Sequence, residues 1–275
     1  MDTIHKNIST KSYTLINGLI RQNKEFFNIS DASNILPDNS IGSVRELIRS
    51  MIKRGLVLKI SDGLYNLIPF EKDVNEYFPN WHLTAKELAK DENYYVGFYS
   101  ALDIHGLITQ PSLVEQIVTS KQIKPKQKTV KDVKFEFIYF NEKHFFGFDN
   151  FWINDFSKVQ CSDVEKTIID CLFIPEYASG ISEIAKALYK AKDKLDQDKM
   201  LNYLERFGSQ SVLKRMGFVL DRLGIMPVLR KYIESKLTNV YAPLDPSLSN
   251  KGKHYSKWRI FDNVGIEDII NSLTT

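Results

Sequence analysis

The sequence predicts an α+β protein made of a small N-terminal part and a larger mixed second part. The small part follows from the order of patterns in residues 13–68, which run as helix, helix, turn, helix and β-hairpin. The larger part follows from β-branched and aromatic runs succeeded by five stretches of helical periodicity. We therefore expect two domains, with residues 71–80 as the linker, because the stretch 69–79 carries two prolines and many charges.

The first predicted helix, residues 13–22, has apolar side chains on one face: Leu15, Ile16, Leu19 and Ile20. Ser30 and Asp31 are N-cap residues and predict a short second helix that ends near Leu36. Residues 37–39, Pro-Asp-Asn, are typical of a turn.

A third helix is predicted over residues 41–54, with Ser40 as its N-cap and Gly55 just beyond its end. Two short apolar runs follow at 56–60 and 64–68, and the Asp62-Gly63 pair between them favours a hairpin. This order is that of a winged helix-turn-helix, a module that places its third helix in the major groove of DNA. Residues 1–70 are thus predicted to be a DNA-binding domain.

The third helix is predicted to have two faces. Its apolar residues should pack on the first two helices: Ile41, Val44, Ile48, Met51 and Ile52. A basic ridge and small polar residues should contact DNA: Ser40, Ser43, Arg45, Arg49 and Lys53. The alternative interpretation of the ridge is a solvated helix face. The start of the first helix (Lys11, Ser12, Tyr13) and the hairpin (Lys59, Ser61) are the other candidate DNA contacts.

The charge balance fits this assignment. Residues 1–70 contain nine Lys or Arg against six Asp or Glu, so they hold the whole formal net charge of +3. No run is apolar enough to cross a membrane, and Met1–Lys6 lacks the apolar core of a signal peptide. Cys161 and Cys171 match no metal spacing and no secreted disulfide framework. We expect a cytoplasmic protein with no membrane association, no metal and no cofactor.

Residues 81–275 are predicted to form the second, α+β domain. Its expected helices are 83–90, 96–107, 163–173, 181–190, 198–207, 210–223 and 227–235. Its expected strands are 115–120, 135–140, 145–153 and 157–161, with two late candidates at 239–244 and 257–261. Ser162 is expected to cap the helix 163–173, with Glu165 completing a capping box.

One stretch of the second domain is unusually basic, with Lys121, Lys124, Lys126 and Lys128 followed by Lys131 and Lys134. It lies between two predicted strands, so it should be a hairpin tip or an exposed loop. Such a loop could rest on DNA phosphates as a secondary contact. The alternative, which we favour, is a solvated lysine loop that protects a sheet edge.

Catalytic motifs are scarce, and we expect no enzyme activity. The five histidines form no HxxxH or HExxH pair, and the sequence has no phosphate-binding glycine loop and no GxSxG elbow. Asp132-Val-Lys134, with Asp103 or Glu115 upstream, imitates the acid and acid-x-lysine pattern of metal-dependent nucleases. A winged-helix-guided nuclease of phage defence is therefore the alternative function.

Several phrases of the second domain resemble those of AbiEi-type antitoxins, from the type IV toxin–antitoxin systems of abortive infection. Residues 97–107 fit the phrase G-x-x-S-A-L-x-x-H-G-L, and residues 162–172 fit S-x-x-E-K-T-x-x-D-x-L. Residues 214–224 are similar to the family's R-x-G-x-L-x-x-x-L-G helix, and Leu244-Asp245-Pro246 and Trp258-Arg259-Ile260 match in order. The hairpin departs from the family, since an arginine cluster is common where Lys59, Ser61 and Asp62 stand.

The resemblance implies a transcriptional autorepressor that binds inverted repeats of double-stranded DNA in its own promoter. It also implies that the second domain counteracts a nucleotidyltransferase-like toxin without forming a stable complex with it. The signature residues themselves have the character of structural residues: His105-Gly106 at a helix end, Glu165-Lys166 at a helix start, and Asp221-Arg222 as a possible ion pair. No heptad run or cysteine pair provides a dimer interface, so we expect a free monomer that pairs on DNA.

Overall fold

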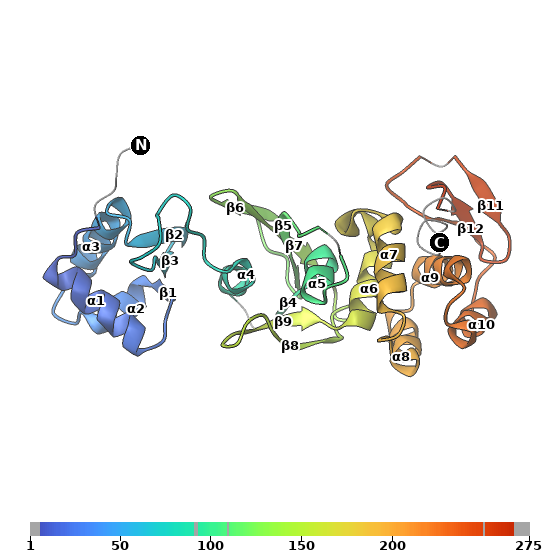
Figure 1. The fold of residues 1–275 in the computed structure, drawn as a ribbon, viewed down its shortest axis with the longest axis horizontal. Coiled ribbons are helices and arrows are strands. Elements are labelled where there is room, and N and C mark those ends of the chain that lie inside the picture. Colours follow the sequence, from blue (N-terminus) through green and yellow to red (C-terminus); the bar gives the residue numbers. More distant parts are fainter. Residues whose placement is uncertain (1–5, 91–92, 109, 250, 267–275) are drawn as a thin grey trace. The chain divides into compact units, whose positions relative to one another are not determined.

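The computed structural model describes residues 6–90, 93–108, 110–249 and 251–266 of a mixed α+β chain (Figure 1). Internal contacts divide the chain into two compact units. The first unit contains the residues up to Lys90 together with Val130–Asp132, and the second contains the remainder. The chain therefore divides at Lys90, and the segment 71–80, which we expected to be a linker, belongs to the first unit.

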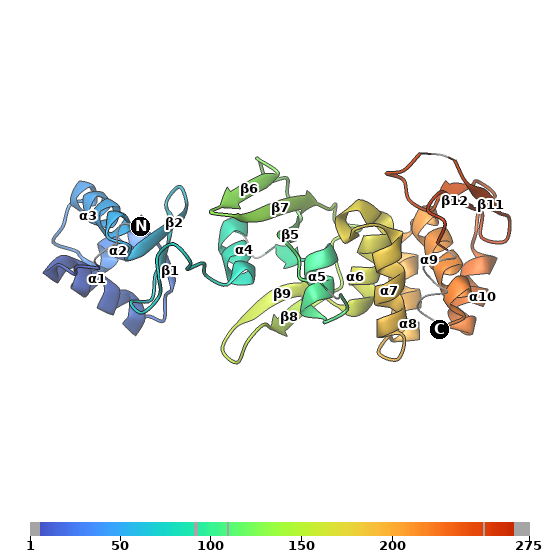
Figure 2. The same cartoon turned by 45° about the horizontal axis from the view of Figure 1, so that its top comes forward.

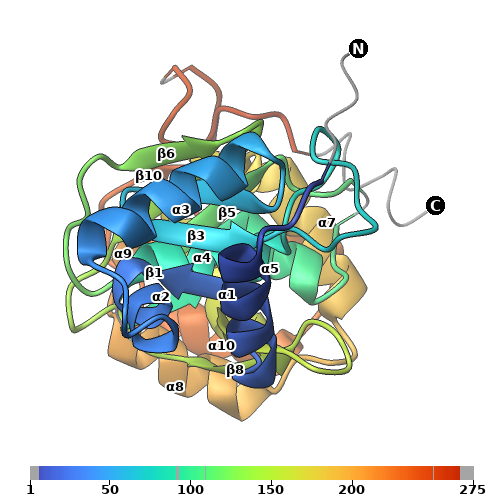
Figure 3. The same ribbon diagram turned by 90° about the vertical axis from the view of Figure 1, so that its left-hand side faces the viewer.

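The first unit contains helices and a small antiparallel sheet in the strand order β1-β3-β2. Figure 3 shows the neighbouring strands β1 and β3 of this sheet together with helices α1, α2 and α3. Its elements are α1 (Thr10–Arg21), β1 (Phe26–Asn28), α2 (Ile29–Ile35), α3 (Ile41–Lys53), β2 (Val57–Ser61), β3 (Leu64–Leu67) and α4 (Trp81–Ala89). Strand β1 was not expected. It pairs with β3 through Phe26↔Asn66, so the partner that makes it a strand lies forty residues further along the chain.

Short side chains cap the helices of the first unit. Ser40 accepts a hydrogen bond from the backbone N–H of Ser43 at the start of α3, as expected. The start of α2 is capped by Asn28, which forms a reciprocal capping box with Asp31; the prediction of a cap at Ser30-Asp31 was wrong by two residues. Helix α1 is capped by Ser9 and begins three residues before the predicted start at Tyr13. These caps satisfy N–H groups that lack partners within the helix.

The segment 71–80 is held to the first unit by hydrogen bonds. The Tyr77 hydroxyl donates to Asn66 Oδ1 at 3.0 Å, where Asn66 is buried in β3. Burial raises the pKa of Tyr77 to about 12, so this hydroxyl keeps its proton. Lys131 Nζ donates to the carbonyl oxygens of Val74 at 2.6 Å and Tyr77 at 2.7 Å. This region is thus ordered through side-chain to backbone bonds that its charged sequence did not indicate.

The second unit is built on a six-stranded sheet in the order β6-β7-β5-β4-β9-β8. Its strands are β4 (Tyr94–Val96), β5 (Val114–Thr119), β6 (Gln127–Val130), β7 (Val133–Tyr139), β8 (Phe148–Trp152) and β9 (Lys158–Ser162). Strands β5 and β7 are parallel, as are β4 and β9, whereas β4–β5 and β8–β9 are antiparallel. A separate small sheet has the order β10-β12-β11.

Helices of the second unit pack beside the sheet and on one another (Figure 2). They are α5 (Phe98–Ile104), α6 (Val164–Phe173), the 3₁₀ turn η1 (Pro175–Ala178), α7 (Ile181–Ala191), α8 (Gln197–Phe207), α9 (Gln210–Leu223) and α10 (Pro227–Ser235). The strands of the small sheet are β10 (Ala242–Pro243), β11 (Lys253–Tyr255) and β12 (Ile260–Asp262).

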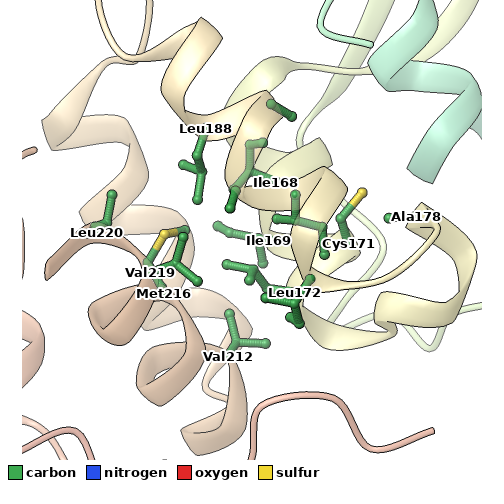
Figure 4. Close-up of a cluster of buried hydrophobic side chains, with 14 of the residues drawn as sticks. Ile168, Ile169, Cys171, Leu172, Ala178, Leu188, Val212, Met216, Val219 and Leu220 are labelled. Atoms are coloured by element: carbon green, nitrogen blue, oxygen red, sulfur yellow. The ribbon is translucent and has the colours of Figure 1, made fainter. Parts of the chain in front are cut away.

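Helix α6 lies at the centre of the hydrophobic core, where its apolar side chains meet those of α7 and α9 (Figure 4). Ile168, Ile169 and Leu172 of α6 are completely buried, as are Leu188 of α7 and Met216 of α9. Cys171 is also buried here, whereas Cys161 is buried in β9. Burying each large aliphatic side chain stabilises a fold by roughly 1.5–3 kcal/mol.

Two predictions for this unit need correction. The predicted helix 96–107 begins only at Phe98, because Tyr94, Tyr95 and Val96 form the buried strand β4 between β5 and β9. Ser162 does not cap α6; it ends strand β9, and Asp163 is the cap that accepts the Lys166 N–H.

No helix within the described ranges combines the length and apolar character that a bilayer crossing requires.

Candidate nucleic-acid interface

Helix α3 presents a buried side and an exposed side. Val44, Ile48 and Met51 are buried against the rest of the first unit. With 3.6 residues per turn, Gly42, Glu46, Arg49 and Lys53 fall on the opposite side of the helix. All four are exposed, and so is Arg45 beside them. One correction applies to the predicted core face, since Ile41 is exposed and Leu47 packs against the core instead.

The charged residues of α3 remain accessible. Arg49 pairs with Glu46 in the same helix, but the two side chains are 68% and 69% exposed. Such a surface pair contributes at most about 1 kcal/mol, so a phosphate or a guanine edge can replace Glu46 as the partner of Arg49. Ser40 and Ser43 are exposed too, and their hydroxyls lie 3.0 Å apart. Ser40 caps α3 and shares a hydrogen bond with the Ser43 hydroxyl, which still leaves each hydroxyl a further hydrogen bond to offer.

The start of α1 places only two of its three candidate residues at the surface. Tyr13 is exposed, and Lys11 is exposed with its Nζ donating to Asn39 Oδ1 at 2.8 Å. Ser12 is buried, and its hydroxyl accepts a hydrogen bond from Arg54 Nη2 at 2.9 Å. The Ser12 side chain is therefore occupied within the fold, and the phosphate contact expected here through the start of α1 stays a prediction. Arg54 also donates to the Asn7 carbonyl, so it joins the end of α3 to the start of α1.

The β2–β3 hairpin offers less than expected. Lys59 Nζ lies 2.6 Å from Asp62 Oδ1, and both groups face solvent. The hydrogen bond between them raises the pKa of Lys59 and lowers that of Asp62, so each holds its charge and neutralises the other. The Ser61 hydroxyl is buried and has no hydrogen-bond partner within the described chain, so its candidacy as a DNA contact is not supported. Gly63, at φ +79°, makes the tight turn.

The basic stretch of the second unit contains a strand that we did not expect. Strand β6 (Gln127–Val130) lies at the edge of the sheet beside β7. Lys121, Lys124 and Lys126 are exposed, whereas Lys128 is half-buried with its Nζ 5.1 Å from the centre of the Phe137 ring. Lysines at an edge strand fit the interpretation that this stretch protects the sheet from pairing with another chain.

The signature residues of the second unit act within the fold. His105 ends α5, and its Nε2 lies 2.6 Å from the Ser162 carbonyl oxygen; burial lowers its pKa. Glu165 accepts from the Asp196 N–H at the start of α8 and pairs with Lys199 at 3.0 Å. Asp221 pairs with Arg230 at 2.7 Å and Lys257 at 3.1 Å, so the expected pairing with Arg222 is not the one observed.

A fully buried ion pair joins Lys166 and Asp170 in α6. The Tyr95 hydroxyl donates to Asp170 at 3.0 Å and lies 3.0 Å from Lys166 Nζ. Burial lowers the pKa of Lys166 and raises that of Asp170 to about 6. Each of the three polar groups is satisfied by the other two, so the arrangement is complete within the fold.

The nuclease pattern is distributed over both units. Asp132 belongs to the first unit, whereas Asp103, Glu115 and Lys134 belong to the second. Asp103 accepts a hydrogen bond from the Ser112 N–H, and Glu115 is almost completely buried. Throughout the described ranges, no group of three or more His, Cys, Asp or Glu side chains is arranged to hold a metal ion.

Comparison with known proteins identifies a similar fold but does not assign the chain to a family. No family model matches the chain. No curated protein matches it either. Among solved structures, the crystal structure of the RV2827C protein from Mycobacterium tuberculosis is similar, with a TM-score of 0.75 over 99% of this chain and 97% of that chain. The two sequences are 15% identical, so the likeness concerns the fold alone.

Proposed function

We propose that the first unit is a winged helix-turn-helix that binds double-stranded DNA in a sequence-specific manner. Helices α2 and α3 joined by a short turn, followed by the β2–β3 hairpin, have the order of that module. The observation that carries the proposal is the exposed side of α3, where Arg45, Arg49 and Lys53 stand opposite a buried apolar side. Arginine pairs bidentately with guanine, and a helix of this kind fits the major groove.

The site therefore consists of two groups of contacts. Arg45, Arg49 and Lys53 would reach base edges and nearby phosphates, with Ser40 and Ser43 at the start of α3. Lys11 and Tyr13, in the first turns of α1, would contact the phosphate backbone. Lys59 would add a hairpin contact once DNA phosphate competes with Asp62 for it. This is a smaller set than the sequence indicated, since Ser12 and Ser61 are turned inward.

The test is a binding measurement on the promoter of the protein's own gene. Arg49→Ala should weaken specific binding by about 1–3 kcal/mol, roughly 5- to 150-fold, without changing the unfolding midpoint. Lys190→Ala is the matched control, because Lys190 is an exposed cation of α7 in the second unit. The parent's affinity should also fall steeply with added salt. Equal affinities of Arg49→Ala and parent for the promoter fragment would contradict the proposal.

From the resemblance to AbiEi-type antitoxins we further propose that the protein represses its own promoter and counteracts a nucleotidyltransferase-like toxin. In this proposal the protein is a cytoplasmic regulator without enzyme activity, and the second unit acts on the toxin. The nuclease alternative rests on the sequence pattern Asp132-Val-Lys134 alone. Incubation with DNA and Mg²⁺ separates the two, since a nuclease would degrade the DNA.

The two proposed activities can be separated in the full chain. The double variant Arg45→Ala/Arg49→Ala should lose promoter binding and still restore growth when the toxin and this variant are expressed from unrelated promoters. The residues that hold the second unit together are unchanged in this variant. If the variant fails to restore growth while the parent succeeds, then toxin neutralisation depends on DNA binding, and the assignment of that activity to the second unit is wrong.

A further inference from the structure

The first turn of α3 carries an apolar side chain that the fold leaves uncovered. Ile41 was expected in the core, yet it is 57% exposed. It precedes Gly42 and stands one helical turn before Arg45, so the two side chains lie on the same side of the helix. More than half of this aliphatic side chain is therefore free to contact a ligand beside the exposed Arg45.

Gly42 is a second residue that the fold does not require. Its φ is not positive, and a Cβ atom added there would meet only the Ser40 hydroxyl, at 3.9 Å. Glycine inside a helix is less favourable than alanine, because it loses more backbone entropy on folding. Since there is room for alanine, the reason for glycine at this exposed position is also to be sought outside the fold.

The two residues occupy the part of α3 that would meet base edges. Gly42 is on the side opposite the buried Val44 and Ile48, in line with Arg49 and Lys53. In modules of this order the N-terminal residues of the recognition helix are those that contact bases. A glycine there lets the helix backbone approach the floor of the groove more closely than any other residue.

We propose that Ile41 and Gly42 form a base-reading surface that selects thymine in the major groove. Gly42 provides the close approach, and Ile41 packs on the C5-methyl group of a thymine near the base contacted by Arg45. Thymine is the only base whose major-groove edge presents a methyl group, so an aliphatic side chain distinguishes it from cytosine. This inference rests on the proposed DNA binding and adds to it the identity of a base.

The experiment uses the full-length protein and the promoter segment that it protects in a footprint. Each thymine of one half-site is replaced in turn by deoxyuridine, which removes only the methyl group. We expect one position to lose about 4-fold in affinity for the parent, the effect of burying one methyl group. Ile41→Ala should bind the thymine and deoxyuridine versions of that position equally well.

Gly42→Ala gives the second readout. Its unfolding midpoint should equal or exceed that of the parent, while its affinity for the same segment falls by about 5-fold or more, because the added methyl group holds the helix away from the bases. A structural role for Gly42 would lower the midpoint instead.

Each outcome has a distinct meaning. The inference is overturned if deoxyuridine is tolerated everywhere, if Ile41→Ala keeps the thymine preference, or if Gly42→Ala binds as tightly as the parent. Arg49→Ala is measured in parallel. If it too binds like the parent, the proposed DNA binding itself has failed, whereas a weakened Arg49→Ala variant confines the failure to Ile41 and Gly42.

Discussion

Lys166 and Asp170 form an ion pair in the fully buried core, where removing charges from water costs free energy. Its ammonium lies between aromatic rings, with Nζ 5.0 Å from the centre of the Phe146 ring and 5.1 Å from that of Phe140. Gly147, at φ +72°, lies so close that a Cβ atom there would stand 2.9 Å from Lys166 Cβ. Burial of two ions is costly unless every charge is paired, so each partner depends on the other.

We predict that Lys166→Met lowers the free energy of unfolding by about 3–5 kcal/mol at pH 8, since it leaves Asp170 buried and unpaired. Lys166 lowers the pKa of Asp170 against the effect of burial, so without Lys166 this pKa rises above about 6. A raised carboxyl pKa favours the folded state at low pH and disfavours it as pH rises through that value. The cost of Lys166→Met should therefore be smaller at pH 5 than at pH 8.

Chemical denaturation at both pH values measures this effect. The double variant Lys166→Met/Asp170→Leu is the control, because it removes both charges and should recover much of the lost stability at pH 8. A cost of Lys166→Met that does not change with pH would show that the loss comes from packing and not from the unpaired carboxylate.

At the scale of elements, the packing of α9 requires a glycine, whereas the packing of α3 leaves room for a larger residue at its glycine. In α9 a Cβ atom at Gly217 would stand 2.2 Å from Trp258 Cζ3 and 3.1 Å from Ile233 Cγ2. The Trp258 indole is fixed in place, because its Nε1 donates to Asp221 at 2.8 Å. Gly217 is thus required for α9 to approach the segment that leads into β12, whereas the exposed Gly42 of α3 has open space.

We predict that Gly217→Ala destabilises the protein by about 1–3 kcal/mol, although alanine favours a helix more than glycine does. The overlap with an immobile indole outweighs the gain in helix propensity. Thermal unfolding compares this variant with Gly42→Ala, which should be neutral or stabilising. A higher midpoint for Gly217→Ala would mean that Trp258 moves aside easily and that α9 does not depend on this contact.

At the scale of the whole molecule, the proposed DNA binding requires more than one copy of the chain, because one recognition helix cannot specify a single promoter. Three or four side chains read only a few base pairs, and a genome presents about 10⁶ or more competing sites. Two copies on an inverted repeat double the readout. The sequence offers no dedicated dimer interface, and the lysines of the 121–134 stretch could lie along DNA or meet a second copy there.

We therefore predict a monomer in free solution and two molecules on each operator. Light scattering of the free protein should give a mass near the 31.8 kDa of one chain. Titration should show tighter binding to the full repeat than to an isolated half-site, because the second copy gains from the first. A stable dimer without DNA, or equal affinity for one and two half-sites, would contradict this prediction.

Elements that depend on nearby residues could be predicted from the sequence. Helix α9 and helix α10 have the predicted bounds, and Ser40 caps α3 as expected. Caps, turns and helical periodicity act within a few positions, so a single sequence contains them. The short strands β1, β4, β6 and β11 were missed because each is only three or four residues long and is defined by partners elsewhere in its sheet.

The sequence by itself determined the order of the three helices and the hairpin in residues 13–68 and the basic ridge of α3, because helical spacing fixes which side chains share a face. Only the tertiary structure decided which of those faces is covered. Ser12, at the polar start of α1, was expected at the surface, yet it is buried and bonded to Arg54. Ile41, on the apolar face of α3, was expected in the core, yet it is exposed. The tertiary structure also enclosed Lys166 with Asp170 and Tyr95, since Tyr95 and Lys166, seventy-one positions apart in the sequence, meet only when α6 packs against β4.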